Sequence, residues 1–182
     1  VERYGGPDEL RIVESSVPQP GRGEVLVQLA LAGVNFIDIY MRDGSYARSH
    51  TYQTPLPLRL GMEGAGTIAA LGADVSDFSL GQRVAYCLSR GAYADYAVVP
   101  AWKLVPVPEG IPLPIATALM LQGSTAHYLT HSAFPLQPGQ TCLIHAGAGG
   151  VGQLLVQLAK RRGVRVIATV GSPEKAELAR QR

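Results

Sequence analysis

Apolar and polar residues alternate over several short segments in the first two-thirds of the chain. From Val25 to Leu31 every second side chain is apolar, which is the pattern of a β-strand with one buried face. Glycine and proline separate such segments, as is typical of strands joined by turns. We therefore predict a compact β-rich barrel or sandwich. Its strands are expected at 24–33, 65–71, 83–87 and 92–99, with one short helix at 36–42.

The pattern changes near Pro112. A longer helix is predicted over 113–132, interrupted at Gly123, and a continuous apolar strand, of the kind buried on both faces, over 141–146. A helix up to Arg162, a second strand over 164–170 and a helix from Pro173 follow. This β-α-β-α order predicts a parallel sheet. Two strands are fewer than the roughly six of a doubly wound sheet, so we expect only the first half of an α/β fold.

Composition excludes several classes of protein. The 182 residues carry 16 Lys and Arg against 14 Asp and Glu, without the clustered basic excess of a nucleic-acid binder. No apolar run is long enough for a membrane span, and no secretory signal opens the sequence as given. The two cysteines, Cys87 and Cys142, lack the spacing of a disulfide framework or a zinc site. We therefore expect a cytoplasmic protein without nucleic-acid or membrane partners.

A glycine-rich turn carries the clearest chemical signal. The residues of this turn, Gly149, Gly150, Val151 and Gly152, directly follow the apolar strand and open a helix inside a βαβ unit. Without side chains, the backbone N–H groups of such a turn can approach a pyrophosphate, and the helix N-terminus favours its negative charge. The pattern predicts dinucleotide binding. The alternative is a structural turn that permits close helix–sheet packing.

The end of the second strand bears on which dinucleotide binds. An acidic residue at this place would bind the ribose 2′-hydroxyl of NADH, but the chain continues with Gly171 and Ser172. Lys175 follows one helical turn later and would attract a 2′-phosphate. We therefore predict NADPH rather than NADH, bound by Gly171, Ser172 and Lys175. The alternative for Lys175 is an ordinary solvated lysine.

The motifs together resemble those of a known family, the zinc-independent quinone oxidoreductases of the medium-chain dehydrogenase/reductase superfamily, or zeta-crystallin-like group. The matching segments are 33–38 (GVNFID), 42–46 (RDGSY), 60–66 (LGMEGAG), 80–84 (LGQRV), 91–96 (GAYADY), 121–126 (LQGSTA) and 145–152 (HAGAGGVG). The resemblance implies a GroES-like, partly open β-barrel at 1–117 for the substrate. It also implies the first half of a Rossmann NADPH-binding domain at 118–182 and, for the full-length protein, a homodimer.

The resemblance also bears on metal binding. Asn35 and Met62 stand where zinc-dependent relatives have a cysteine and a histidine, and neither suits catalytic zinc. His127 and His131 are four residues apart, but two ligands alone do not make a metal site. We therefore expect no metal.

The resemblance implies hydride transfer from NADPH to a quinone. Asn35, Tyr40 and Tyr46 would line the catalytic cleft, and Thr125 would bind near the nicotinamide carboxamide. The alternatives are a turn-forming role for Asn35 and core packing for Tyr40. Asp38 is expected to cap or bridge rather than act as a base. Tyr93 and Tyr96 are expected to be ordinary sheet residues.

Two other functions stay open. An enone or alkenal reductase on the same scaffold would reduce a C=C bond conjugated to a carbonyl. Alternatively, a chain truncated within the nucleotide-binding domain would be an inactive binding or structural module.

Overall fold

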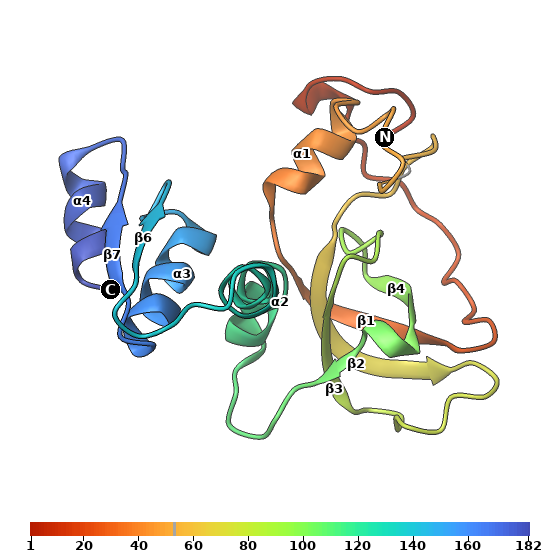
Figure 1. Ribbon diagram of the computed structural model, residues 1–182. Coiled ribbons are helices and arrows are strands. Elements are labelled where there is room, and N and C mark those ends of the chain that lie inside the picture. Colours follow the sequence, from red (N-terminus) through yellow and green to blue (C-terminus); the bar gives the residue numbers. More distant parts are fainter. Residues whose placement is uncertain (53) are drawn as a thin grey trace. The chain divides into compact units, whose positions relative to one another are not determined.

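A computed structural model describes residues 1–52 and 54–182. The chain divides into two compact units, Val1–Met120 and Leu121–Arg182, and each is described by itself (Figure 1). No helix among the described residues has both the length and the apolar character to span a bilayer.

The first unit is built on a five-stranded sheet in which every pairing is antiparallel. The strand order is β4-β1-β2-β3-β5, so β4 and β5 form the two edges and the sheet is not a closed barrel in the described part of the chain (Figure 1). The strands are β1 (Glu24–Ala32), β2 (Glu63–Leu71), β3 (Arg83–Cys87), β4 (Tyr96–Pro100) and β5 (Val105–Pro106).

The core of this unit includes Val25 and Val27 of β1, Val84 of β3 and Val99 of the edge strand β4, all of them fully buried. The alternation predicted for β1 fails at Leu26, which is buried between Val25 and Val27. The pairing of β1 with β2 shifts register between Leu26 and Val27, and such an irregularity re-aims side chains. The extra residue at this shift is Ala69 of β2, and burial along β1 does not follow strict alternation.

The helices that lie wholly within the first unit are short, and the longer helix α2 crosses its boundary at Met120. The predicted helix is confirmed as α1 (Phe36–Arg42), and 3-10 turns occupy Pro7–Glu9 and Ala101–Lys103. The strand predicted from residue 92 begins only at Tyr96, so Tyr93 lies outside the sheet.

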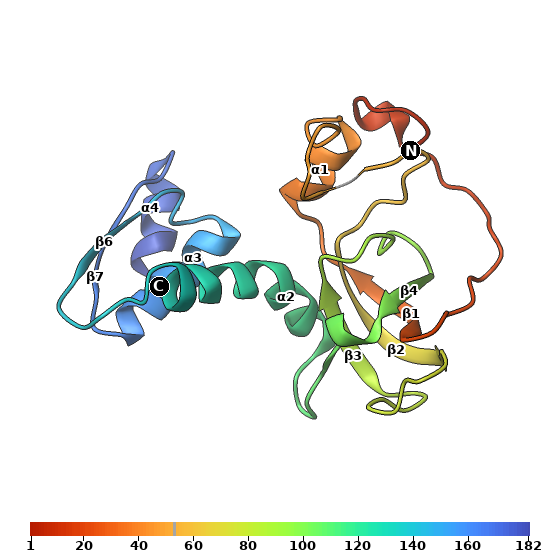
Figure 2. The same ribbon diagram turned by 45° about the vertical axis from the view of Figure 1, so that its right-hand side comes forward.

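The predicted interruption at Gly123 is wrong, because α2 runs from Leu113 to His127 without a break. Figure 2 shows α2 from the side as one continuous helix. A glycine inside a helix costs about 1 kcal/mol relative to alanine, which a helix of this length tolerates. A π-helical segment, Tyr128–Ala133, then follows in place of the last predicted α-helical turn.

The second unit holds a parallel pair of strands, β6 (Thr141–Ile144) and β7 (Arg165–Ala168), connected by α3 (Gly150–Arg161) and followed by α4 (Pro173–Arg180). Its small core contains Leu136, Ala159 and Val164. The expectation of strands buried on both faces is wrong here. Leu143 and Ile167 are 57% and 49% exposed, since this two-stranded sheet does not bury both of its faces.

The close pairing of β1 with β2 makes a testable prediction about Gly66. A Cβ on Gly66 would lie 1.9 Å from the carbonyl oxygen of Gln28, on the paired backbone. We expect Gly66→Ala to lower the free energy of unfolding by about 1–3 kcal/mol, the usual cost of overpacking. Urea denaturation measures this loss. The matched control is Gly6→Ala, where no atom lies within 4 Å of the new Cβ. Equal free energies of unfolding for the two variants would contradict the predicted clash at Gly66.

Candidate active site and cofactor site

The first turn of α1 is closed by two side chains that bind each other's backbone. Asn35 is the N-cap residue, and its side chain accepts a hydrogen bond from the N–H of Asp38. In return the N–H of Asn35 donates to Oδ2 of Asp38 at 3.0 Å. This reciprocal capping box satisfies two helix donors that would otherwise be orphaned. The expected capping role of Asp38 is thus present.

A buried carboxylate fixes the amide of Asn35. Nδ2 of Asn35 donates to Oε2 of Glu63 at 2.8 Å, and both side chains are buried. Gly33 makes room for this carboxylate, because a Cβ there would lie 1.9 Å from Oε2. The amide oxygen therefore faces the helix and the amide nitrogen faces Glu63. Asn35 is an N-cap residue, as the turn-forming alternative implied, and it also carries this long-range bond.

Tyr93 joins this cluster, which sequence reasoning missed. Its hydroxyl donates to Oδ2 of Asp38 at 2.9 Å, so the expectation of an ordinary sheet residue is wrong for Tyr93. Oδ1 of Asp38 has no hydrogen-bond partner among the described residues. Burial raises the pKa of Asp38, against the opposing effect of the bonds from Asn35 and Tyr93. Burial, together with the nearby Asp38 carboxylate, raises the pKa of Tyr93, which keeps its phenol protonated.

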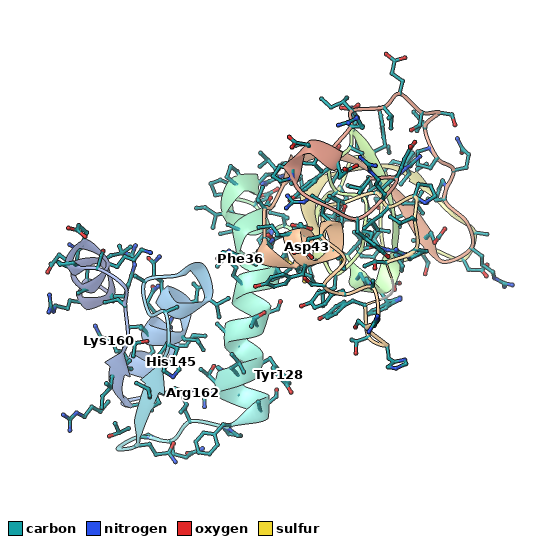
Figure 3. All side chains as sticks on the ribbon, turned by 90° about the horizontal axis from the view of Figure 1, so that it is seen from above. Phe36, Asp43, Tyr128, His145, Lys160 and Arg162 are labelled. Carbon is teal, nitrogen blue, oxygen red and sulfur yellow. The ribbon has the colours of Figure 1, made fainter. Side chains whose placement is uncertain are left out.

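Four aromatic rings form a row beside this cluster. Neighbouring ring centroids lie 6.3 Å apart for Phe36–Tyr40, 5.6 Å for Tyr40–Tyr46 and 5.1 Å for the stacked pair Tyr46–Tyr52. Figure 3 labels Phe36, the first residue of α1, and Asp43, the C-cap residue that follows the helix. Tyr40 is 40% exposed, so the alternative of a core aromatic is wrong. The structure thus brings Tyr40 and Tyr46 together, and it adds Tyr52, which the sequence analysis did not single out.

The glycine turn opens α3 as predicted. Gly149 is the N-cap residue, and its N–H donates to the carbonyl of Ala146 at 2.8 Å. A Cβ on Gly152 would lie 2.2 Å from that same carbonyl oxygen, and one on Gly150 would lie 2.1 Å from Oε1 of Gln122. Internal packing therefore requires Gly152, whose neighbours are backbone atoms, whereas at Gly150 the flexible side chain of Gln122 could move aside. Gly149 and Gly150 are nevertheless exposed at the helix N-terminus, where an anion is favoured.

The end of β7 and the start of α4 carry the other predicted cofactor residues. Ser172 is the N-cap of α4, and its hydroxyl accepts from the backbone N–H of Lys175 at 3.3 Å. A side-chain hydrogen bond from Ser172 also lowers the pKa of Glu174. Gly171 has open space where a Cβ would lie, and Lys175 is exposed. Both are therefore accessible to a ligand.

Thr125 and Gln122 lie on α2, ahead of the glycine turn in sequence. The hydroxyl of Thr125 donates to the carbonyl of Leu121 at 2.7 Å, which leaves its oxygen able to accept. Gln122 lies against Gly150, at the first turn of α3. Gln122 stands in the 121–126 motif, but the sequence analysis did not single it out, and its proximity to Gly150 is visible only in the structure.

The sheet and the glycine turn define a chain with a GroES-like domain and the first part of a dinucleotide-binding domain. Residues 21–109 match the model of the alcohol dehydrogenase GroES-like domain. A quinone oxidoreductase of Pseudomonas aeruginosa is 46% identical over 98% of this chain and 54% of its own length. A 2-haloacrylate reductase from Burkholderia is 40% identical over 100% of this chain and 55% of its own length.

The solved structure of an Escherichia coli quinone oxidoreductase complexed with NADPH superimposes with a TM-score of 0.93 at 36% identity, covering 99% of this chain and 54% of that one. Over nearly its whole length the chain is thus similar to quinone oxidoreductases of the medium-chain dehydrogenase/reductase superfamily. It spans about half the length of the relatives it matches. The expected α/β fold, a GroES-like open barrel followed by the first part of a Rossmann sheet, is confirmed.

The raised pKa of Asp38 makes a prediction about stability and pH. The folded chain binds this proton more tightly than the unfolded chain, so the stabilising contribution is complete below the ordinary value of 3.8. It is lost as the pH rises through the folded value. Asp38→Asn stays neutral, and its amide oxygen can still accept both bonds to Oδ2. We expect this variant to gain stability relative to the unaltered chain as the pH rises from about 4 to 7.

Urea unfolding of both proteins across that range measures this difference. Asp77→Asn, at an exposed carboxylate, is the matched control and is expected to keep the pH dependence of the unaltered chain. A constant difference between Asp38→Asn and the unaltered chain at every pH would show that Asp38 binds its proton equally in both states.

Proposed function

We propose that the protein containing this chain is an NADPH-dependent quinone reductase. The observation that carries the proposal is the row of aromatic rings beside the Asn35 cap. Tyr40 and Tyr46 present flat faces and hydroxyls without formal charge, which suits a flat, electron-poor acceptor. Relatives named quinone oxidoreductases, one of them solved with NADPH, support it.

The residues of each unit would then have distinct roles in the reaction. NADPH supplies the two electrons as a hydride from its nicotinamide, and the reduced quinone takes up one further proton from a donor or from solvent. Asn35, Tyr40 and Tyr46 line the acceptor side, within a substrate domain assigned to 1–117. Glu63 orients the Asn35 amide, and the second N–H of that amide would donate to the acceptor or to the carboxamide.

The residues of the second unit fit the cofactor. In the assigned domain 118–182, the exposed Gly149 and Gly150 with Val151 bring backbone N–H groups to the diphosphate. Gly152 permits the close packing of the turn, and Thr125 accepts a bond from the carboxamide. Gly171, Ser172 and Lys175 surround the 2′-phosphate, where an ammonium replaces the acid of an NADH site.

We also propose that catalysis needs no zinc. The amide of Asn35 is engaged by Glu63, and the Met62 thioether beside it is a poor zinc ligand. A cytoplasmic location and a homodimer of the full-length protein remain part of the proposal.

A second candidate activity has its own support. A relative at 40% identity is named a 2-haloacrylate reductase, so reduction of an activated C=C bond is the alternative on this scaffold. The third alternative is a chain without activity that only binds or packs.

Two measurements decide between these functions. Fluorescence titration with NADPH and NADH tests cofactor binding, and NADPH consumption is then followed with 1,4-naphthoquinone and with 2-hexenal at equal concentrations. Faster turnover of the quinone supports the proposal, whereas faster turnover of the alkenal selects the alternative. NADPH binding without either turnover indicates a binding module, and no NADPH binding contradicts the cofactor assignment for this chain.

Lys175→Ala tests the choice of cofactor. Removal of a charge-assisted contact to the 2′-phosphate should weaken NADPH binding by about 1.5–3 kcal/mol and leave NADH binding nearly unchanged. Parallel titrations with both cofactors measure this. The control Lys160→Ala removes another exposed lysine of the second unit and should change neither affinity. An equal loss for NADPH and NADH at Lys175→Ala would refute a 2′-phosphate contact.

A further inference from the structure

A second feature of the first unit lies beyond the aromatic row. It is a cavity of about 400 Å³ next to Tyr52, whose ring stacks on that of Tyr46. Buried Met41 and Met62 contribute apolar, polarisable surface to it. A cavity of this size holds a small ring system, and methionine adapts to flat ligands.

The charge of the cavity is one-sided. Arg90 and Lys103 line it, together with hydroxyl groups that include that of Ser89, and no aspartate or glutamate is among the described lining residues. The ammonium of Lys103 donates to the carbonyl of Leu88, a neutral partner, and none of the salt bridges among the described residues involves Lys103. Two cations and several hydroxyl donors around an apolar floor suit an anion with an apolar body.

The backbone beside the cavity is held in an unusual conformation. Leu88 has a φ of 58°, in the left-handed region that a leucine rarely adopts. Its N–H donates to the carbonyl of Met62 at 2.7 Å, while its own carbonyl accepts from Lys103. Such local strain persists only where the surroundings fix it, and it is common at ligand sites.

We propose that this cavity binds the negatively charged substituent of the acceptor. The substrate class is therefore a flat, electron-poor quinone or conjugated alkene that bears a carboxylate or sulfonate, with its ring against Tyr46 and Tyr52 and its anionic group at Lys103. This inference rests on the proposed function for the acceptor side, and it adds a preference for anionic over neutral acceptors.

The test compares two ligands of the same ring, 1,4-naphthoquinone-2-sulfonate and 2-methyl-1,4-naphthoquinone, by calorimetric titration without NADPH. The sulfonate is expected to bind about tenfold tighter at low salt, and the preference should shrink as ionic strength rises. Trp102 provides a local reporter, since it is the only tryptophan and its ring centroid lies 5.2 Å from Nζ of Lys103. Saturable quenching of its emission by the sulfonate would place the ligand beside Lys103.

Variants locate the interaction. Lys103→Gln should lose about tenfold in affinity for the sulfonate and leave the neutral quinone unaffected, while Lys103→Arg should retain the preference. Arg59→Gln removes one exposed positive charge from the same unit and controls for net charge. Thermal unfolding checks that each variant is folded. If Lys103→Gln does not fold, the salt-dependent preference of the unaltered chain decides.

Several outcomes would overturn the inference. The first is that the unaltered chain binds the two quinones with equal affinity. The second is that Lys103→Gln loses affinity for both quinones equally. The third is that Arg59→Gln loses as much affinity for the sulfonate as Lys103→Gln does. A parallel titration of Lys103→Gln with NADPH tests whether the cavity serves the cofactor instead, and a loss of NADPH affinity there would also overturn it. If neither quinone nor NADPH binds the unaltered chain, the proposed function itself fails.

Discussion

The buried hydrogen bond between Asn35 and Glu63 is the contact on which the arrangement of the first unit depends. It joins the start of α1 to the start of β2 and thereby fixes where the aromatic row lies relative to the sheet. Its geometry is demanding, because a buried carboxylate without a partner costs several kcal/mol. Gly33 is part of the same constraint, since any Cβ at that position would displace the carboxylate.

Local patterns predicted most of the secondary structure because their causes are local. The capping box at Asn35 and Asp38 and the glycine turn at Gly149 act within one turn of helix, and both are visible in a single sequence. The predictions failed where distant packing decides. Leu26 is buried although strict alternation would expose it, and Gly123 continues a helix although glycine is a weak helix former.

The residues of the candidate site also fall into those that a local motif suggests and those that distant packing brings in. Asn35, Tyr40 and Tyr46 lie on one helix and the loop after it, so a motif could suggest them. Glu63 and Tyr93 reach the cap of α1 from 28 and 55 residues further along the chain, at Asn35 and Asp38 respectively. A lone glutamate and a tyrosine in a predicted strand carry no signal of this. The cofactor role of Gly150 and Gly152 stays a prediction, and for Gly152 internal packing explains the lack of a side chain as well as phosphate access does.

The distribution of charge suggests why an enzyme of this kind would need so few ionised groups near its acceptor. Asp38 lies under the cap of α1, and burial works against its ionised form. The hydroxyl of Tyr93 stays protonated because burial raises its pKa. A neutral aromatic surface of this sort attracts flat acceptors through stacking and offers little discrimination among them. Discrimination then requires charge placed to one side of the rings, and the cationic rim of the cavity beside Tyr52 has that position.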